Sequence, residues 1–242
     1  MLEIIPAVDV KQGRCVRLVQ GNMSSETVYF EDPLAAARFW TDQGAARLHI
    51  VDLDGAVSGS PKNRKVIERV VKEIPIPVQL GGGLRTSEDI QHYFDAGVDR
   101  IILGTSVYRQ PEFVKDAMRQ HPQRIFLGID AKEGVVAVEG WTHVTQIRPI
   151  DLIQTYASLP VGGVIYTDIS RDGMLTGPNL AGIREVVTLS FLPVIASGGI
   201  SKREDVLVLS PLQTEGLIGI IIGKALYTGA LTLREAKDAV RI

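Results

Sequence analysis

Three aspartates stand where short apolar segments of the sequence end, and their residue type suits acid–base chemistry. Asp9 and Asp130 each close such a segment, and Asp172 follows a third one. An isomerisation by acid–base catalysis, for example, needs one ionised carboxylate to accept a proton and one neutral carboxyl group to donate a proton. Burial and neighbouring negative charge separate carboxyl pKa values in that direction. One aspartate alone could simply cap the next helix, but three together favour catalysis.

Two pairs of glycine-rich turns are suited to bind phosphate groups. Glycine has no β-carbon, so backbone N–H groups in such turns can approach an anion closely. A tight turn between a strand and a helix is the ordinary alternative. Because the turns occur twice, we expect a ligand with a phosphate at each end. The first pair comprises Gly81, Gly82, Gly83 and Arg85 with Gly104, Thr105 and Ser106; the second comprises Ser197, Gly198 and Gly199 with Gly223 and Lys224.

Two further side chains are candidates for contact with a ligand. Thr167 can direct a hydroxyl toward the aspartates, although it is equally an ordinary strand residue. Trp141 stands in an expected loop and can stack on a flat ring, with core packing as its alternative. We also expect the polar segment 20–27 to form a lid loop that excludes water.

Neither the histidines nor the cysteine points to a metal or a cofactor. The four histidines, His49, His92, His121 and His143, show no spacing typical of metal ligands. We expect His49 in the core and both His92 and His121 on helix surfaces. Cys15, the only cysteine, lies in an apolar run and is interpreted as a core residue. The spacing of these residues therefore indicates no zinc or iron site.

Eight short apolar segments alternate with amphipathic ones, and the fold that they form must bring the aspartates and glycine turns together. Continuous apolar runs are typical of parallel strands covered on both faces. Eight such units in 242 residues predict an α/β protein with a (β/α)8 TIM barrel rather than an open sheet. Helices are expected at 33–43, at 62–73, from 86 to about 96, and from near 111. The expected strands are 2–10, 47–52, the start of 78–85, 99–104, 125–130, 163–168, 192–197 and 219–223.

The two halves of the sequence repeat the same landmarks in the same order. Such an echo predicts one domain built from two (β/α)4 half-barrels, at about residues 1–121 and 122–242. All the landmarks then lie at strand carboxyl ends, which meet at one end of the barrel. The pairs are Asp9 and Asp130, 121 residues apart; Asp52 and Asp168, 116 apart; Gly82 and Gly198, 116 apart; and Gly104 and Gly223, 119 apart.

The composition of the chain indicates which kinds of molecule it can bind. Apolar residues make up 45% of the chain, charged residues 22%, and the net charge is −2. Without a basic block, nucleic acid is not an expected partner. The sequence has no secretory leader pattern and no apolar run of membrane-spanning length. We therefore expect a cytoplasmic monomer that binds a small bisphosphorylated molecule and does not bind membranes.

Six motifs together resemble the phosphoribosylformimino-aminoimidazole carboxamide ribotide isomerases of histidine biosynthesis. The resemblance covers essentially the whole chain and implies a cofactor-free Amadori rearrangement of an aminoaldose with a phosphate at each end. The motifs are PAVDV at 6–10, VRLVQG at 16–21, HIVDLDG at 49–55, QLGGGLR at 79–85, TDISRDG at 167–173 and ASGGI at 196–200.

The resemblance also implies roles for individual residues. Asp9 matches the general base that takes the C2′ proton. Asp172 is assigned as the proton donor to the ring oxygen, and Asp130 and Thr167 orient the substrate, although Asp130 and Asp172 could exchange roles. We place Arg17 and Gly21 of the second motif among the substrate-binding residues.

Three alternatives remain at this point. The related imidazole glycerol phosphate cyclase typically reads CLDV and VVKG where this chain has 7–10 and 16–21. A bifunctional isomerase that also serves tryptophan biosynthesis typically has a basic residue where this chain has Glu139. A phosphosugar-binding barrel without activity would not need all three aspartates.

Overall fold

A closed barrel of parallel strands forms the centre of the molecule. The computed structural model describes residues 2–240. Each barrel strand pairs in parallel with the next one along the chain, and the last pairs with the first, so that Glu3 lies opposite Gly219. The predicted (β/α)8 barrel is confirmed. Its strands are β1 (Glu3–Lys11), β4 (Leu48–Asp52), β5 (Val78–Gly81), β6 (Arg100–Leu103), β7 (Ile125–Lys132), β10 (Gly163–Asp168), β11 (Val194–Ser197) and β12 (Leu217–Ile222).

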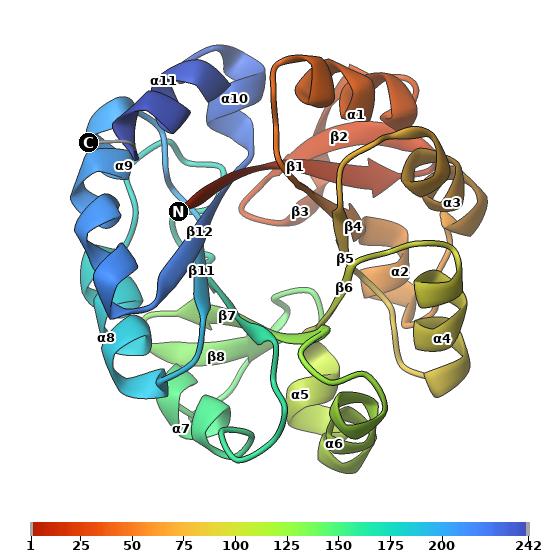
Figure 1. Cartoon of the computed structure of the whole chain (residues 1–242), viewed down its shortest axis with the longest axis vertical. Coiled ribbons are helices and arrows are strands. Elements are labelled where there is room, and N and C mark those ends of the chain that lie inside the picture. The colour runs from red at the N-terminus through yellow and green to blue at the C-terminus, as the bar shows by residue number, and fades with distance from the viewer. Residues whose placement is uncertain (1, 241–242) are drawn as a thin grey trace.

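Helices surround the barrel and connect its strands (Figure 1). Local sequence sets several of their ends: α1 begins at Pro33 with Asp32 as its cap, and Thr86 caps α4 by accepting a hydrogen bond from the Asp89 amide. The helices are α1 (Pro33–Asp42), α2 (Leu53–Ser58), α3 (Arg64–Glu73), α4 (Ser87–Asp95), α5 (Thr105–Arg109), α6 (Pro111–Gln120), α7 (Pro149–Gln154), α8 (Leu180–Ser190), α9 (Arg203–Leu209), α10 (Lys224–Thr228) and α11 (Leu233–Ala239), with a 3₁₀ helix η1 (Ser210–Glu215).

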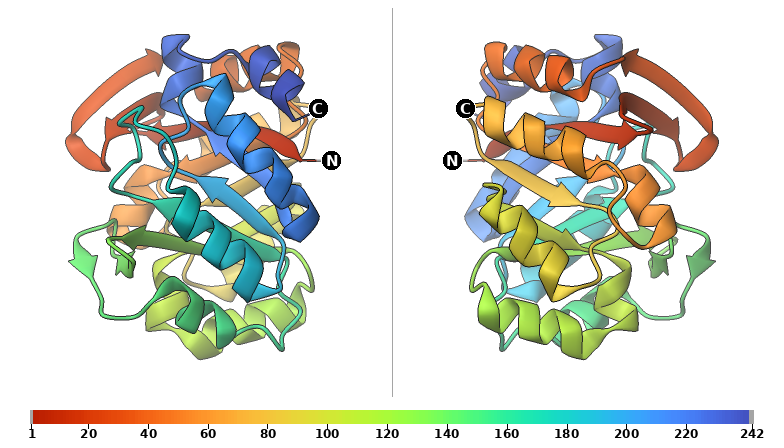
Figure 2. Two further views of the ribbon diagram at one scale, coloured as in Figure 1. Left: turned by 90° about the vertical axis from the view of Figure 1, so that its left-hand side faces the viewer. Right: turned by 90° about the vertical axis from the view of Figure 1, so that its right-hand side faces the viewer.

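Two antiparallel hairpins extend the barrel wall at one end. β2 (Arg14–Val19) and β3 (Asn22–Phe30) continue from β1, and β8 (Val135–Val138) and β9 (His143–Val144) continue from β7. Figure 2 shows both hairpins projecting from the same end of the barrel, away from the chain termini. The expectation of a loop at 20–27 is therefore wrong, since most of that segment belongs to β3.

The hairpins repeat the internal echo of the sequence. β1 turns into β2 through Gln12 and Gly13, and β7 turns into β8 through Glu133 and Gly134, 121 residues later. All four residues have positive φ, as tight two-residue turns require. The two halves of the barrel thus carry equivalent extensions, while the exact half-barrel boundaries stay a prediction.

The apolar core has two parts. One lies inside the barrel and is filled mainly by branched residues: Ile5, Ala7, Ile102, Phe126, Ile165, Ile195 and Ile221. The larger one lies between the outer face of the strands and the helices. Because apolar side chains fill the barrel from within, the open space for a ligand lies at its ends rather than along its axis.

Candidate active site

A cavity of about 280 Å³ opens at the carboxyl ends of the barrel strands. Every site residue predicted from the sequence lines it, although these residues come from positions between 9 and 224 of the chain. They are Asp9, Arg17, Gly21, Gly81, Gly82, Gly83, Arg85, Gly104, Thr105, Ser106, Asp130, Trp141, Thr167, Asp172, Ser197, Gly198, Gly199, Gly223 and Lys224. The placement agrees with the predicted site, while the role of each residue remains a prediction.

Asp9 faces the cavity from β1 and is paired with Arg17 of β2. The Arg17 Nη1 donates a hydrogen bond to Asp9 Oδ2 over 2.6 Å. Burial raises the pKa of Asp9, whereas the charge and hydrogen bond of Arg17 lower it. Arg17 thus partly offsets the effect of burial, and the pKa of Asp9 stays above its ordinary value.

Asp130 faces Asp9 from β7 and is held by two neutral donors. The Trp141 Nε1 donates to Asp130 Oδ2 over 2.8 Å, and Thr167 on the adjacent strand contributes a second side-chain hydrogen bond. Burial raises the pKa of Asp130 and these hydrogen bonds lower it. The indole also covers Gly21, where a β-carbon would overlap its six-membered ring. Trp141 thereby connects the two hairpins across the cavity mouth.

Asp172 is surrounded differently, in the turn that follows β10. Burial is the largest influence and raises its pKa to about 6, and the negative charges of Asp9 and Asp130 act in the same direction. The positive charges of Arg17 and Lys224 oppose this shift. Of the three carboxyl groups, Asp172 therefore combines burial with two neighbouring carboxylates and is the one best suited to carry a proton.

The first glycine turn follows β5 and packs closely on the backbone. Gly82 and Gly83 both have positive φ, and a β-carbon on them would overlap the backbone of Asp52 and Gly55, respectively. The buried Asp52 carboxylate accepts backbone N–H groups of Gly55, Lys62 and Asn63, and so fixes that neighbouring segment. Asp52 is consequently a structural residue that keeps the glycine turn in place.

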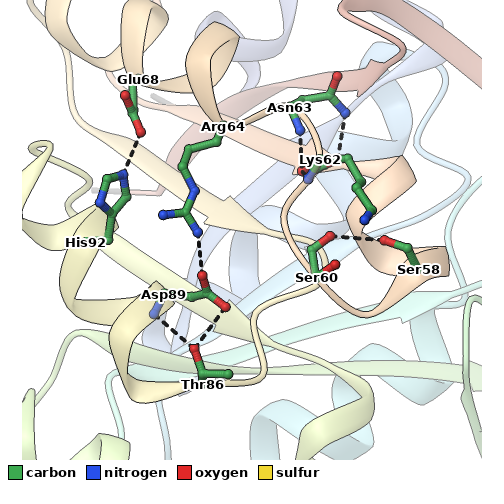
Figure 3. A network of polar contacts seen from close by, with 10 residues as sticks. Ser58, Ser60, Lys62, Asn63, Arg64, Glu68, Thr86, Asp89 and His92 are labelled. Atoms are coloured by element: carbon green, nitrogen blue, oxygen red, sulfur yellow. Dashed lines mark hydrogen bonds and ion pairs between the residues drawn. The ribbon is translucent and has the colours of Figure 1, made fainter.

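Polar contacts between α3 and α4 anchor this turn from behind (Figure 3). Asp89 accepts from the Thr86 hydroxyl and pairs with Arg64 of α3, while His92 of α4 pairs with Glu68. The contacts fix the start of α4 immediately after Arg85, whose side chain lies over Gly59 and faces the cavity. As predicted, His92 lies on a helix surface.

The second glycine turn repeats this construction after β11. Gly198 and Gly199 have positive φ, and a β-carbon on them would overlap the backbone of Asp168 and Gly177. The buried Asp168 accepts from Ser170 N and Asn179 Nδ2, at 2.9 and 2.7 Å. Two equivalent turns thus flank the carboxyl groups, and each is followed around the barrel by a strand that leads into a short helix, α5 or α10.

His49, expected in the core, also lines the cavity. It is enclosed in the barrel and also lines the cavity floor, and Gln79 Nε2 lies 3.0 Å from its Nδ1. Burial and the nearby Arg17 lower the pKa of His49 to about 3, so the ring is neutral. His49 on β4 lies opposite Ala7, two residues before Asp9 on β1. Its position two residues before Val51, which pairs with Asp9, was the signal that its side chain could reach the cavity.

The comparisons with known proteins agree with one another. A family model described as "Histidine biosynthesis protein" matches residues 3–232. A protein of Geobacter sulfurreducens is 51% identical over 233 residues, 96% of either chain, and one of Trichlorobacter lovleyi is 48% identical over 238 residues, 98% of this chain and 97% of its own. Both are named 1-(5-phosphoribosyl)-5-((5-phosphoribosylamino)methylideneamino) imidazole-4-carboxamide isomerase. None of the helices within residues 2–240 is long and apolar enough to cross a membrane.

Proposed function

The chain belongs to the histidine biosynthesis protein family, and from this premise we propose that it is the isomerase named in its curated relatives. The observation that carries the proposal is that three carboxyl groups lie between two glycine turns in one cavity. The reaction is an Amadori rearrangement that converts the aminoaldose into the aminoketose, an isomer of the same composition.

Asp172 and Asp9 divide the proton transfers. Asp172 donates a proton to the ring oxygen while the bond between C1′ and that oxygen breaks, which leaves a protonated Schiff base at C1′. That cation acidifies the C2′–H bond, and Asp9 removes the C2′ proton. Reprotonation at C1′ and loss of the proton from the C2′ hydroxyl complete the ketone. The raised pKa of Asp172, about 6, supports its role as the donor.

Asp130 is better suited to orient the substrate than to donate a proton. Both of its contacts, with Trp141 and Thr167, stabilise the ionised carboxylate because the partner side chains donate hydrogen bonds to it. This arrangement favours the assignment of Asp172 as the acid over the exchanged one.

The glycine turns bind the two phosphates. Each turn has backbone N–H groups, an adjacent helix start and one cation, Arg85 in the first turn and Lys224 in the second. Binding both ends of the ligand places its reacting sugar between the carboxyl groups. We also propose that the protein is a cytoplasmic monomer.

A comparison of two substrates tests this function. Purified protein is incubated separately with the histidine-pathway aminoaldose and with the tryptophan-pathway aminoaldose, and each product is quantified. We expect turnover of the first alone, because the position where the bifunctional enzymes typically carry a basic residue holds Glu139, whose carboxylate pairs with Arg109 over 2.7 Å. Turnover of both would establish the bifunctional enzyme, and binding without turnover would establish a phosphosugar-binding protein.

A further inference from the structure

The guanidinium of Arg17 is held by groups on several sides. Besides donating to Asp9, it donates through Nη2 to the Ala7 carbonyl oxygen, and its carbon Cζ lies 4.6 Å from the centroid of the Tyr227 ring. A β-carbon on Gly223 would lie 2.9 Å from its Nη1, so the glycine leaves room for the cation. Arg17 is thus enclosed between β1, β2 and α10, and its placement brings positive charge to Asp9.

Tyr227 is itself fixed from behind. Its hydroxyl donates to the Ala7 carbonyl oxygen over 2.8 Å and accepts a hydrogen bond from Trp40 Nε1 over 3.1 Å. Its ring packs against the rings of Trp40 and Tyr29, with centroids 5.1 and 5.0 Å away. Tyr227 lies behind the residues that line the cavity, so it can affect the reaction only through its neighbours.

We propose that Tyr227 is a positioning residue whose ring face holds the Arg17 guanidinium against Asp9. A cation over an aromatic face is attracted by the ring quadrupole, and the attraction is largest where both groups are desolvated. A planar guanidinium can lie flat on such a ring while its edge donates hydrogen bonds, which a lysine cannot do. The inference rests on the proposed function, because it assigns Asp9 as the base.

The charges around Asp9 give this inference a measurable consequence. Arg17 lowers the pKa of both Asp9 and Asp172, so displacing it raises both. Activity needs Asp9 ionised and Asp172 protonated, and both limbs of the pH profile of kcat/KM therefore move to higher pH. The titratable or charged groups around Asp9 are Cys15 and Arg17 on β2, His49 on β4, Asp130 on β7, Asp172 after β10, and Lys224 and Tyr227 on α10.

A pair of substitutions at one position separates the ring from its hydroxyl. In Tyr227→Leu the aromatic face is lost, and we expect both limbs to move up by about one pH unit and kcat at the pH optimum to fall roughly tenfold, as for the loss of one partly desolvated cation–π contact. KM should stay within about twofold. In Tyr227→Phe the face remains, so its pH profile should match that of the unsubstituted protein. Thermal unfolding of each variant checks that it is folded, and Tyr227→Met replaces the leucine variant if that one is not.

A double substitution tests whether Tyr227 acts through Arg17. In an Arg17→Met background, Tyr227→Leu should leave the pH profile and kcat unchanged, because the cation that the ring positions is already absent. Additive effects would overturn the proposal. So would equal effects of the phenylalanine and leucine variants, or a rise in KM alone, which would mean that Tyr227 supports the α10 phosphate site. Failure of the unsubstituted protein to turn over substrate would instead contradict the proposed function.

Discussion

At the scale of single residues, three aspartates of the same cavity have three different surroundings. Asp9 has a cation 2.6 Å away, Asp130 has two neutral donors, and Asp172 has burial and neighbouring negative charge. Residue type alone could not distinguish them, since the differences come from Arg17 and Trp141, which stand elsewhere in the sequence. Residues of the same type can thus serve as a proton donor and as a proton acceptor in different surroundings.

Asp172 should reduce the stability of the folded protein at neutral pH. Its folded-state pKa of about 6 lies above the value of about 3.8 expected in the unfolded chain, so the folded state binds the proton more tightly. Its favourable contribution is present below pH 3.8 and is lost as the pH rises to about 6. Asp172→Asn should therefore be more stable than the unsubstituted protein at pH 8, by about 1–3 kcal/mol.

Urea unfolding at two pH values measures this effect. The stability gained by Asp172→Asn should shrink when the same experiment is done at pH 4, where the aspartate is largely protonated in the folded state. Asp151→Asn provides a matched control, because Asp151 is exposed and its pKa is lowered by Arg148 rather than raised. Equal stability of Asp172→Asn and the unsubstituted protein at pH 8 would show that folding does not raise the pKa of Asp172.

At the scale of elements, the strand-to-helix turns were predictable, whereas the hairpins were missed. Apolar runs ending in glycine indicate a buried strand and its turn, and these runs predicted the positions of the two glycine turns correctly. β3 is rich in polar residues because one face of the hairpin is exposed, and this composition resembles a loop. The signal for the hairpin was Gln20 and Gly21, two residues of positive φ between Val19 and its pairing partner Asn22.

Gly83 should not tolerate a side chain. It has φ 75°, and a β-carbon would overlap the carbonyl group of Gly55, so Gly83→Ala must move the turn that is proposed to bind phosphate. We expect the unfolding free energy to fall by about 2–4 kcal/mol and KM to rise roughly tenfold or more. Denaturant unfolding and steady-state kinetics measure the two effects.

Gly134→Ala is the matched control for backbone strain. Gly134 has a similar φ of 84°, but a β-carbon there would meet no atom within 4 Å. We expect a cost of about 1 kcal/mol from the left-handed conformation and no change in KM. If both alanine variants behaved alike, close packing would not be the reason for glycine at position 83.

At the scale of the whole molecule, the two ends of the barrel differ in role: one end carries the cavity, and the other carries ion pairs that stabilise the fold. The sequence echo predicted the barrel because each half repeats strands, turns and landmarks. In such a barrel the carboxyl ends of the strands meet at one end, and the aspartates and glycine turns lie there. The opposite end was not readable in advance, since its ion pairs join residues distant in sequence: the buried Arg47 pairs with Glu3 and Asp99. The side chains there lie at the amino ends of the strands, away from the cavity.

Arg47→Met should therefore change stability without changing catalysis. Loss of its ion pairs should lower the free energy of unfolding by about 1–3 kcal/mol, because the guanidinium is buried and its hydrogen bonds are charge-assisted. The values of kcat and KM should remain unchanged. Arg119→Met, which removes an exposed pair with Asp116, should cost no more than about 0.5 kcal/mol. A large loss of activity in folded Arg47→Met would show that the two ends are coupled.

The central claim is that Asp9 removes a proton from a sugar bound by both of its phosphates. Its most direct test is conversion of the histidine-pathway aminoaldose by Asp9→Asn, measured in single turnover beside calorimetric binding of the same substrate. We predict that the variant binds the substrate within about tenfold of the unsubstituted affinity and that conversion falls by a factor of about 1,000 or more. Undiminished conversion by Asp9→Asn would contradict the account.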